Sequence, residues 1–437
     1  MAVPIRILLY LLVLFAPLVL VSLFRPQTDH SIVYEIGKNF ALLGFTILIL
    51  QFVLAPRLKW IERPFGLDVI IQFHRYMGIF ALALLLLHPF LLAAGGRGWS
   101  LLYAVNFPWY IWLARLALLI LLSLVLLSLF RKLLRLDFQR WRQLHNILAL
   151  VIIPSVFLHS WYAGGDLSIV PLRVLWVAFL VLSILLYSYH RVLRPKKLRA
   201  GAYRVIELLQ ETHDVWTVKL APAEGEEIFD YHPGQFHFIT LHRSGGLPVE
   251  EHPFTISSSP TQRDFISSTI KASGDFTATI AHTKPGDIAV VHGPFGRFSH
   301  NLLSKEKHLV FIAGGVGITP FMSMLRYMHD TRSDITVTLL YANKTQNDII
   351  FKDQLAELVA ARIIQLQVIH FLSQPSEDWQ EGTGYLNGDK IVKCCGGNLE
   401  NKEFYLCGPP IMTKQIIRDL RNLRVPHGRI HFEQFSF

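Results

Sequence analysis

Six long apolar runs occupy the first 193 residues and restrict what this chain of 437 residues can fold into. Each run contains roughly 20 residues, the length an α-helix needs to cross the hydrocarbon core of a bilayer. We therefore predict six membrane-spanning helices, near residues 5–24, 35–55, 69–94, 108–130, 143–163 and 171–191. No small-residue cleavage site follows the first run and five more runs come after it, so we expect an uncleaved helix rather than a signal peptide.

Basic residues are unevenly distributed between the loops that join these runs. They gather in loop 56–68, in loop 131–142 and in the stretch "HRVLRPKKLR" after the sixth run. Loops rich in Lys and Arg stay on the cytoplasmic side of a cell membrane. We therefore place both termini and everything after residue 194 in the cytoplasm. The net charge of +10 follows from this bias, and no basic-aromatic motif indicates nucleic-acid binding.

Three cysteines lie in the part placed in the cytoplasm: Cys394, Cys395 and Cys407. Neighbouring cysteines rarely bridge each other, and cytosolic proteins seldom carry disulfides. We expect all three to be free thiols.

Four histidines stand out in the apolar runs, as two pairs with one spacing. His74 and His88 lie 14 residues apart in the third run, and His145 and His159 lie 14 apart in the fifth. Fourteen residues of α-helix rise about 21 Å in nearly four turns, so each run presents two histidines on one face. Two helices together then offer a bis-histidine set at each of two depths, which suits two b-type haems. Polar residues satisfied within the bundle or a proton relay are the alternatives, and a zinc site is less favoured because each layer lacks further ligands.

Arg115 is the charged residue well inside the fourth run. It lies about 10 Å from the outer end of that helix, close to the depth of His88 and His159. A buried arginine in lipid needs a partner, and a haem propionate or an anionic substrate would serve. Snorkelling to the outer surface is the alternative.

The rest of the chain shows two different patterns. From about residue 201 to 300, short alternating strands broken by Gly and Pro indicate an antiparallel β-barrel. From about 306, strands alternate with helices, which indicates a parallel, Rossmann-like α/β unit. We predict three domains: a six-helix, all-α transmembrane bundle over 1–194, the barrel over 195–300 and the α/β domain over 301–437.

The junction "VFIAGGVGITPFMSML" joins a predicted strand to a predicted helix. Gly314, Gly315 and Gly317 form its turn, and Thr319 and Pro320 open the helix. Glycines let the backbone approach a pyrophosphate, and the helix N-terminus offers N–H donors. The strand–turn–helix context favours a dinucleotide site, and a tight turn without a ligand is the alternative.

The segment "YANKTQND" follows the next predicted strand. NAD sites usually place a carboxylate there for the ribose 2′-OH, whereas NADP sites prefer a positive group. Lys344 is positive and favours NADPH, while Asp348 lies slightly later and leaves NADH open.

With these motifs in order along nearly the whole chain, the sequence resembles the NADPH oxidase and ferric reductase family, including its minimal bacterial members. That family fuses a six-helix haem domain to a ferredoxin-reductase-like module. Its third and fifth helices carry the haem ligands, which match His74, His88, His145 and His159. The resemblance implies two b-type haems, FAD in the barrel and NADPH in the α/β domain.

The resemblance also implies particular flavin contacts. The motif "HPFT" would bring its threonine hydroxyl near the isoalloxazine and its histidine near the ribityl-phosphate chain, and a Gly-x-x-Thr turn would hold the pyrophosphate. The matching residues are His252, Pro253, Phe254, Thr255, Gly274, Thr277, Gly293 and Gly296. Lys271, in the strand "SSTIKA", is a further candidate for cofactor binding.

Two C-terminal motifs complete the candidates. In "CGPP", Cys407 is implied to lie near the nicotinamide ring, with Gly408 and Pro409 at the dinucleotide. The family often ends on an aromatic residue that covers the flavin. In "HFEQFSF" the match is Phe437, with Phe435 in reserve and Glu433 as another cofactor-binding candidate; either Phe can alternatively pack as an ordinary strand residue.

The implied chemistry is electron transfer from NADPH through FAD and two haems to an acceptor across the membrane, with the cofactors carrying the reaction. Arg115, Cys407 and Phe437 are the catalytic candidates. An oxidase would reduce O2 to superoxide, whereas a ferric or cupric reductase would reduce a chelated metal ion. Short outer loops without a carboxylate cluster, together with Arg115, favour O2 or an anion.

A transporter or channel with a nucleotide-sensing domain is the non-enzymatic alternative, and it leaves the four histidines unexplained. We see no calcium-binding or adaptor segment before the first helix, so we expect no regulatory subunit. The expected partners are the lipid bilayer and the electron acceptor.

Overall fold

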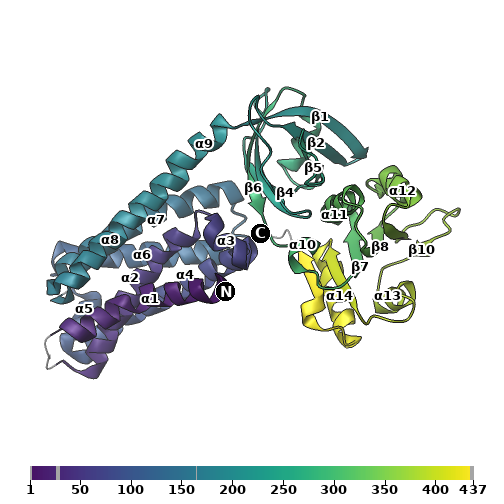
Figure 1. Ribbon diagram of the computed structural model, residues 1–437. Helices are drawn as coiled ribbons and strands as arrows, with labels where there is room; N and C mark the ends of the chain where they lie inside the picture. The colour runs from purple at the N-terminus through teal and green to yellow at the C-terminus, as the bar shows by residue number, and fades with distance from the viewer. Residues whose placement is uncertain (1, 26–29, 164, 434–437) are drawn as a thin grey trace. The chain divides into compact units, whose positions relative to one another are not determined.

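The chain folds into two compact units, Met1–Pro195 and Lys196–Phe437. The computed structural model describes residues 2–25, 30–163 and 165–433. The first unit is helical, and the second carries two β-sheets with their helices (Figure 1).

Six helices of the first unit are long and apolar enough to cross a membrane, as predicted. They are α1 (Ala2–Phe24), α2 (Ile32–Leu54), α4 (Leu67–Leu92), α6 (Trp109–Leu129), α7 (Phe138–Ala163) and α8 (Val170–Ser188). The short helices are α3 (Lys59–Phe65), α5 (Ser100–Tyr103) and α9 (Arg194–Ala200). The third and sixth spans are longer than expected, because π-helical turns over Ala93–Arg97 and Tyr189–Leu193 directly follow α4 and α8.

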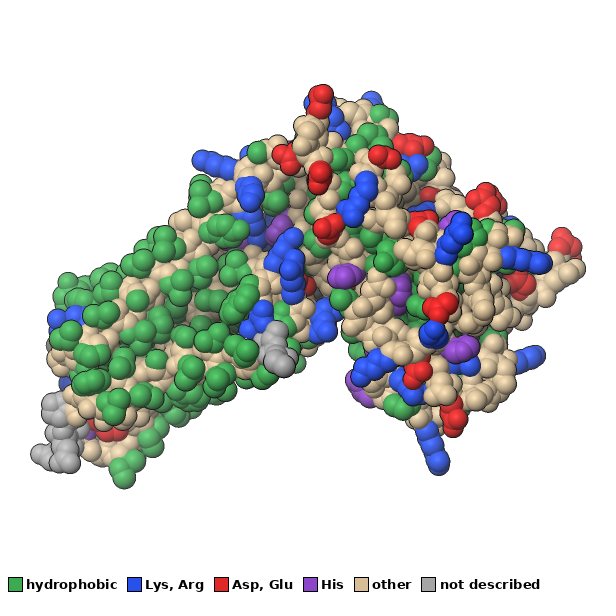
Figure 2. All heavy atoms as spheres, viewed as in Figure 1, with side chains coloured by type: hydrophobic (Ala, Val, Ile, Leu, Met, Phe, Trp, Pro, Cys, Tyr) green, Lys and Arg blue, Asp and Glu red, His purple; other side chains and the backbone are tan. Residues whose placement is uncertain are grey.

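Helix α2 is the most buried of the six spans found among the described residues. Small residues let α4 approach it closely: a Cβ added at Gly37 would lie 2.9 Å from Leu91 Cβ, and one at Gly44 would lie 2.7 Å from Leu85 Cγ. Membrane helices associate through such close packing because lipid offers no hydrophobic driving force between them. Apolar side chains cover the visible outer face of the helical unit (Figure 2), as a lipid-facing surface requires.

The first sheet of the second unit is antiparallel, with strand order β4-β3-β6-β1-β2-β5. Its strands are β1 (Tyr203–Thr212), β2 (Val215–Ala221), β3 (Phe236–His242), β4 (Glu251–Thr255), β5 (Ile266–Lys271) and β6 (Ile288–Phe295). The edges β4 and β5 come together beyond the end of β4, where the Ser257 amide donates to the Ser267 carbonyl at 2.8 Å. The sheet therefore curls toward a barrel.

The second sheet is parallel, with strand order β10-β9-β8-β7-β11-β12. Its strands are β7 (His308–Gly314), β8 (Thr336–Asn343), β9 (Gln365–Leu372), β10 (Gly382–Thr383), β11 (Lys402–Cys407) and β12 (Ile430–Glu433). The helices are α10 (His300–Leu303), α11 (Thr319–Asp330), α12 (Lys352–Ala361), α13 (Gly388–Cys394) and α14 (Pro410–Asn422). With the antiparallel sheet and the helical bundle, this confirms the predicted fold class.

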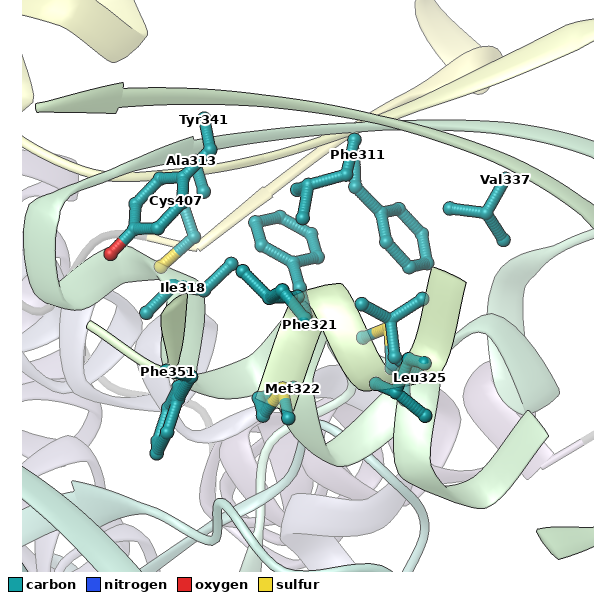
Figure 3. Packing of buried hydrophobic residues seen from close by; sticks show 14 of the residues in the cluster. Phe311, Ala313, Ile318, Phe321, Met322, Leu325, Val337, Tyr341, Phe351 and Cys407 are labelled. Atoms are coloured by element: carbon teal, nitrogen blue, oxygen red, sulfur yellow. The ribbon is translucent and has the colours of Figure 1, made fainter. Parts of the chain in front are cut away.

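Alternate residues of β7 face opposite layers of helices. Phe311 belongs to the core shared with α11 and α12, and Ile312 to the core shared with α13 and α14. Figure 3 shows the first of these cores, in which the Phe311 and Phe321 rings stack with their centroids 4.8 Å apart. The chain proceeds from β7 toward β8 on one side and later returns to β11 on the other, so the strand order reverses between β7 and β11. Ligands bind at such a switch point, at the carboxyl ends of the strands.

Candidate functional site

His88 and His159, the pair that we predict to lie toward the outer side of the membrane and call the outer histidines, each have one ring nitrogen close to a backbone carbonyl. His88 Nδ1, on α4, lies 2.8 Å from the Gly37 oxygen, and His159 Nδ1, on α7, lies 3.0 Å from the Tyr110 oxygen. A carbonyl oxygen only accepts, so each Nδ1 carries the hydrogen and each Nε2 keeps its lone pair. Both rings are fixed in tautomer and orientation, with Nε2 able to bind a metal ion.

The inner histidines, His74 on α4 and His145 on α7, meet each other directly. Their ring centroids are 6.1 Å apart and their planes are inclined by 49°. Both Nδ1 atoms are buried and have no hydrogen-bond partner within the part of the chain that the structure describes. The Trp141 ring lies 5.4 Å from the His145 ring. Packing rather than hydrogen bonding therefore holds the inner pair.

The two pairs occupy two levels of the bundle. As membrane spans, α4 and α7 run in the same direction, because only α6 crosses between them. On each helix the outer histidine comes 14 residues after the inner one, which corresponds to a rise of about 21 Å. Since the inner rings meet, the outer two also share a level.

Arg115 finds partners of a kind that the sequence did not suggest. Its guanidinium donates to the carbonyls of Leu101 and Ala104, both at 2.8 Å. It also lies 4.7 Å from the Trp112 ring centroid and 5.4 Å from that of Phe107. The side chain thus links α5 and the segment after it to α6, and its catalytic role stays a prediction.

Two carboxylates come together where we had expected no carboxylate cluster: Glu35 in the first turn of α2, and Asp166 between α7 and α8. Glu35 pairs with Arg25, while Asp166 lies 2.6 Å from Arg25 Nη2 and 2.8 Å from Lys38 Nζ. The sequence hid this cluster because its members lie in three separate segments. Each carboxylate is paired with a cation, so the cluster is an ion-pair network rather than an open cation site.

The flavin motif forms β4, which pairs with β3 at the edge of the sheet. The His252 ring stacks on Phe276 with centroids 4.2 Å apart, and its Nε2 lies 2.8 Å from Glu250 Oε2. Thr255 is buried at the end of the strand, and Phe254 packs against the barrel core. Pro253 pairs with Phe238 of β3. Proline has no backbone N–H, and an edge strand such as β4 tolerates it because fewer of its N–H groups bond to a neighbouring strand.

The Gly-x-x-Thr turn is present, its polar groups bond within the turn, and its role in holding a pyrophosphate stays a prediction. The Thr277 hydroxyl accepts from the amides of Ser273 and Gly274, at 3.0 and 2.9 Å, and opens a 3-10 helix over Thr277–His282. Lys271, just before this turn, forms an ion pair with Asp214 at 3.0 Å.

The segment "GPFG" forms the end of β6 and lies close to β3 at both of its glycines. A Cβ added at Gly293 would lie 2.7 Å from His237 Cβ, and one at Gly296 would lie 2.9 Å from the Phe236 ring. Both positions therefore exclude larger residues for reasons of packing within the barrel.

The nucleotide glycines form one site from two distant turns. A Cβ added at Gly317 would lie 2.2 Å from the Cys407 oxygen, one at Gly314 would lie 2.7 Å from Pro409 Cδ, and one at Gly408 would lie 3.0 Å from the Gly314 amide nitrogen. Backbone thus lies against backbone at the carboxyl ends of β7 and β11. This is the switch point of the parallel sheet, where a dinucleotide is expected.

Further contacts hold this glycine turn in shape. Gly315 has a φ of +53°, which favours glycine, and a Cβ there would meet nothing within 4 Å. Its carbonyl accepts from the buried Tyr341 hydroxyl of β8 at 3.1 Å. The Thr319 hydroxyl donates to the Val316 carbonyl at 3.0 Å, and Pro320 occupies the first turn of α11. Tyr341 is a contributor that the sequence did not reveal.

Lys344 and Asp348, the two residues weighed for nucleotide choice, have different environments. Lys344 is exposed just after β8. The Asp348 carboxylate caps a short helix, accepting from the Thr345 amide at 2.9 Å and its hydroxyl at 2.7 Å. Burial disfavours the charged form, but the bonds from Thr345 outweigh it and keep the pKa of Asp348 below its usual value. The Asp348 carboxylate is therefore already hydrogen-bonded by Thr345, so of these two charged side chains Lys344 is the one available to a ligand.

Cys407 ends β11 with its side chain buried in the core against α11 (Figure 3). Burial, and next the nearby Glu433 carboxylate, raise the pKa of its thiol well above the usual value, so it stays protonated at neutral pH. Glu433 stands beside Cys407 in the β11–β12 register, and Gly296 of the barrel lies close to it. Phe435 and Phe437 lie outside the described residues.

Three segments of the chain match known families. Residues 40–156 match the ferric reductase like transmembrane component, residues 202–297 an FAD-binding domain and residues 311–418 the oxidoreductase NAD-binding domain. In this order the three domains form the architecture of the NADPH oxidase and ferric reductase family. The chain is a multi-pass membrane oxidoreductase with FAD and NAD(P) domains, which sets aside the transporter alternative.

Individual relatives match about half of the chain. Sulfhydrogenase 2 subunit gamma of Pyrococcus furiosus is 30% identical over 52% of this chain and 81% of its own length. NADH-cytochrome b5 reductase 1 of Candida glabrata is 30% identical over 52% of this chain and 80% of its own. Among solved structures, the cytochrome b5 reductase domain of Ulva prolifera nitrate reductase is similar, with 22% identity, a TM-score of 0.48 and coverage of 53% of this chain and 97% of that domain.

Proposed function

We propose that the chain carries electrons from cytoplasmic NADPH through FAD and two b-type haems to O2 on the opposite side of the cell membrane, forming superoxide. The observation that carries this proposal is the arrangement of four histidines as two levels across α4 and α7. The inner level alone brings a pair of imidazoles together from helices 71 residues apart in the chain, since 145 − 74 = 71.

The residues present suit haem iron, which imidazole nitrogens would bind. Two imidazole rings that bind one metal ion, each through a nitrogen about 2 Å from it, have centroids no more than about 6 Å apart. The ring centroids of His74 and His145 are 6.1 Å apart. The outer pair meets another requirement, because a metal-bound imidazole usually donates its second N–H to a carbonyl or carboxylate, as His88 and His159 do.

When bound, the nicotinamide supplies hydride, the flavin divides two electrons into single ones, and the haems relay them. The chain's own residues bind and orient these groups. His74 and His145 define the inner position, and His88 and His159 the outer. The turns at Gly314–Gly317 and Cys407–Pro409 let the dinucleotide approach bare backbone. None of these positions requires a side-chain acid or base.

The preference for NADPH is supported by the exposed cation at the end of β8. Lys344 is available to a 2′-phosphate, whereas the Asp348 carboxylate is occupied by Thr345. A ribose 2′-OH would have to compete with that cap.

The proposed orientation has both termini in the cytoplasm. Loops 56–68 and 131–142 and the segment after residue 190 carry the basic residues, and they border the level of His74 and His145. The level of His88 and His159 then faces the opposite side, where the acceptor is reduced.

A ferric-chelate reductase is the second candidate, because residues 40–156 match a family described as ferric reductase like. Against direct binding of a metal cation, Glu35 and Asp166 are paired with Arg25 and Lys38. Arg115 supports an anionic acceptor less than its sequence position suggested, because its guanidinium already binds two carbonyls.

Spectroscopy and acceptor assays on the purified full chain test the proposal. We expect NADPH to reduce the flavin anaerobically and then give the absorbance of reduced b-type haem, with two haems for each chain. With air admitted, oxygen uptake that superoxide dismutase lowers would indicate the oxidase. Ferric-chelate reduction that superoxide dismutase leaves unchanged would indicate the second candidate, and the absence of haem would refute both.

A further inference from the structure

We propose that Ser323 and Arg326 of α11 are positioning residues for hydride transfer, which fix the dinucleotide turn relative to the segment that follows the flavin motif. This inference rests on the nicotinamide-to-flavin half of the proposed function and is independent of haem and of the final acceptor.

One end of α11 belongs to the dinucleotide site. The helix starts at Thr319, directly after the Gly314–Gly317 turn. Its apolar face, with Phe321, Met322 and Leu325, is buried against the parallel sheet (Figure 3). The helix and the turn at its start therefore move only with the sheet, as one rigid body.

Farther along, the same helix binds the barrel. The Ser323 hydroxyl donates to the Ser258 carbonyl at 2.7 Å, and Arg326 Nη1 donates to the Ser257 carbonyl at 2.5 Å. Ser257 and Ser258 come two and three residues after Thr255, the last residue of β4 and of the "HPFT" motif. Only a few residues thus separate the flavin motif from a helix that starts at the nucleotide turn.

The barrel side of this junction is itself rigid. The Ser258 hydroxyl lies 3.0 Å from the Tyr231 hydroxyl and accepts from the Ser267 amide at 3.0 Å. The Ser257 hydroxyl lies 3.0 Å from that of Ser267. Ser257 and Ser258 are also buried. A displacement of α11 would therefore also move β4, the strand that contains the "HPFT" motif, because no flexible loop lies between them to absorb it.

Arg326 is held on several sides at once. Its guanidinium lies 5.0 Å from the Phe351 ring centroid, and Nη2 donates to Gln354 Oε1. The Glu211 carboxylate of β1, which accepts from the Thr217 hydroxyl at 2.6 Å, contributes a favourable charge interaction. A partly buried guanidinium needs partners for its donors, and these contacts together restrict the side chain of Arg326.

That rigidity matters because hydride transfer requires the nicotinamide and the flavin at contact distance. Holding reacting groups in register supplies much of the rate of such a step, and a misplacement of about 1 Å can cost roughly a hundredfold. An interface that only stabilises the fold would instead affect FAD content or melting temperature. The two roles therefore differ in what they change.

The variants are Ser323→Ala, Arg326→Lys and Arg326→Met in the full chain. Thr261→Ala is the matched control, because Thr261 also bonds across this interface, to Asp330 at the far end of α11, but at an exposed position. Anaerobic stopped-flow absorbance measures flavin reduction by NADPH and by 4-deuterated NADPH, over a range of concentrations, with FAD content and melting temperature measured on the same samples.

We expect flavin reduction at saturating NADPH to fall roughly tenfold in Ser323→Ala and up to about a hundredfold in Arg326→Met. The deuterium isotope effect should rise, while the apparent affinity for NADPH and the FAD content stay within about twofold of wild type. Arg326→Lys keeps the charge but loses the planar fork, and should lie between wild type and Arg326→Met. Thr261→Ala should match wild type.

Unchanged reduction rates and isotope effects in FAD-loaded Ser323→Ala and Arg326→Lys would overturn the inference, as would a loss that follows FAD content. If Arg326→Met does not fold, these two milder variants decide the matter. A wild-type chain that neither NADPH nor NADH reduces would refute the proposed function, and this inference with it.

Discussion

The two units of the molecule make their candidate sites from different parts of the chain. In the helical unit, four imidazole side chains on α4 and α7 carry the site. In the second unit, Lys196–Phe437, which we call the reductase unit, the dinucleotide site is a backbone surface, where the turn at Gly317 meets the turn at Cys407 and Gly408. The first site therefore depends on the donor atoms of its side chains, whereas the second depends on the absence of side chains at its glycines.

The largest expected effect is the loss of a ligand in the helical unit. His88→Leu keeps an apolar side chain of similar size but removes Nε2, so the outer haem should be lost and transmembrane electron flow should stop. Flavin reduction by NADPH should continue, because it occurs in the other unit. Haem content by pyridine haemochrome, with His74→Leu as the inner counterpart, checks this; two haems retained in His88→Leu would show that the ligand assignment is wrong.

The next effect comes from adding a single carbon to the backbone site. In Gly317→Ala the new Cβ would overlap the Cys407 oxygen, at 2.2 Å. We expect kcat/KM for NADPH to fall by roughly a hundredfold or more, equivalent to about 2.7 kcal/mol, with FAD still bound.

Gly315→Ala is the control for that prediction, because its Cβ would meet nothing within 4 Å and only the positive φ of +53° is strained. A left-handed alanine costs about 1–2 kcal/mol, which should appear mainly as lower thermal stability. Equal losses of kcat/KM in the two variants would argue against close backbone approach as the reason for Gly317.

Lys344→Ala tests a side-chain contribution within the reductase unit. A lost charged hydrogen bond is worth about 1.5–3 kcal/mol, so KM for NADPH should rise roughly ten- to a hundredfold while KM for NADH changes little. Steady-state flavin reduction with each nucleotide measures the ratio. Asp348→Asn is the companion variant; it should weaken the Thr345 cap and affect both nucleotides alike. Equal changes for both nucleotides in Lys344→Ala would clear Lys344 of this role.

The smallest expected effect concerns the terminal aromatic residue. If Phe437 covers the flavin, Phe437→Ser should lower KM for NADH and narrow the NADPH preference by about two- to tenfold, the worth of one aromatic stack. These changes should occur at full FAD occupancy. Loss of FAD with an unchanged preference between NADPH and NADH would indicate that Phe437 only packs. If Phe435→Ser gives the change in preference instead, Phe435 is the residue that covers the flavin.

Features that depend on local chain geometry could be predicted from the sequence alone. Six apolar runs specify six spans because the helical rise per residue and the bilayer thickness are fixed. The same rise places His74 and His88 at two levels, and likewise His145 and His159. The strand–turn–helix at Gly314–Thr319 could also be predicted, because glycines and a following proline restrict or free the backbone only locally.

Contacts between distant segments were decided only by the tertiary structure. Nothing in the sequence selects the carbonyls of Gly37 and Tyr110 as anchors for His88 and His159, since every residue type carries a carbonyl. The ion pairs of Glu35 and Asp166 likewise depend on how three segments pack.

The same reason governs the reductase unit. Gly408 faces Gly314 only because β11 returns beside β7. Ser323 and Arg326, which read as an ordinary serine and arginine in a helix, reach Ser258 and Ser257 only because the barrel closes against α11. Helix rise and turn chemistry are properties of neighbouring residues, whereas these contacts are properties of the packed whole. For this reason the sequence alone indicated the candidate ligands but not the contacts that orient them.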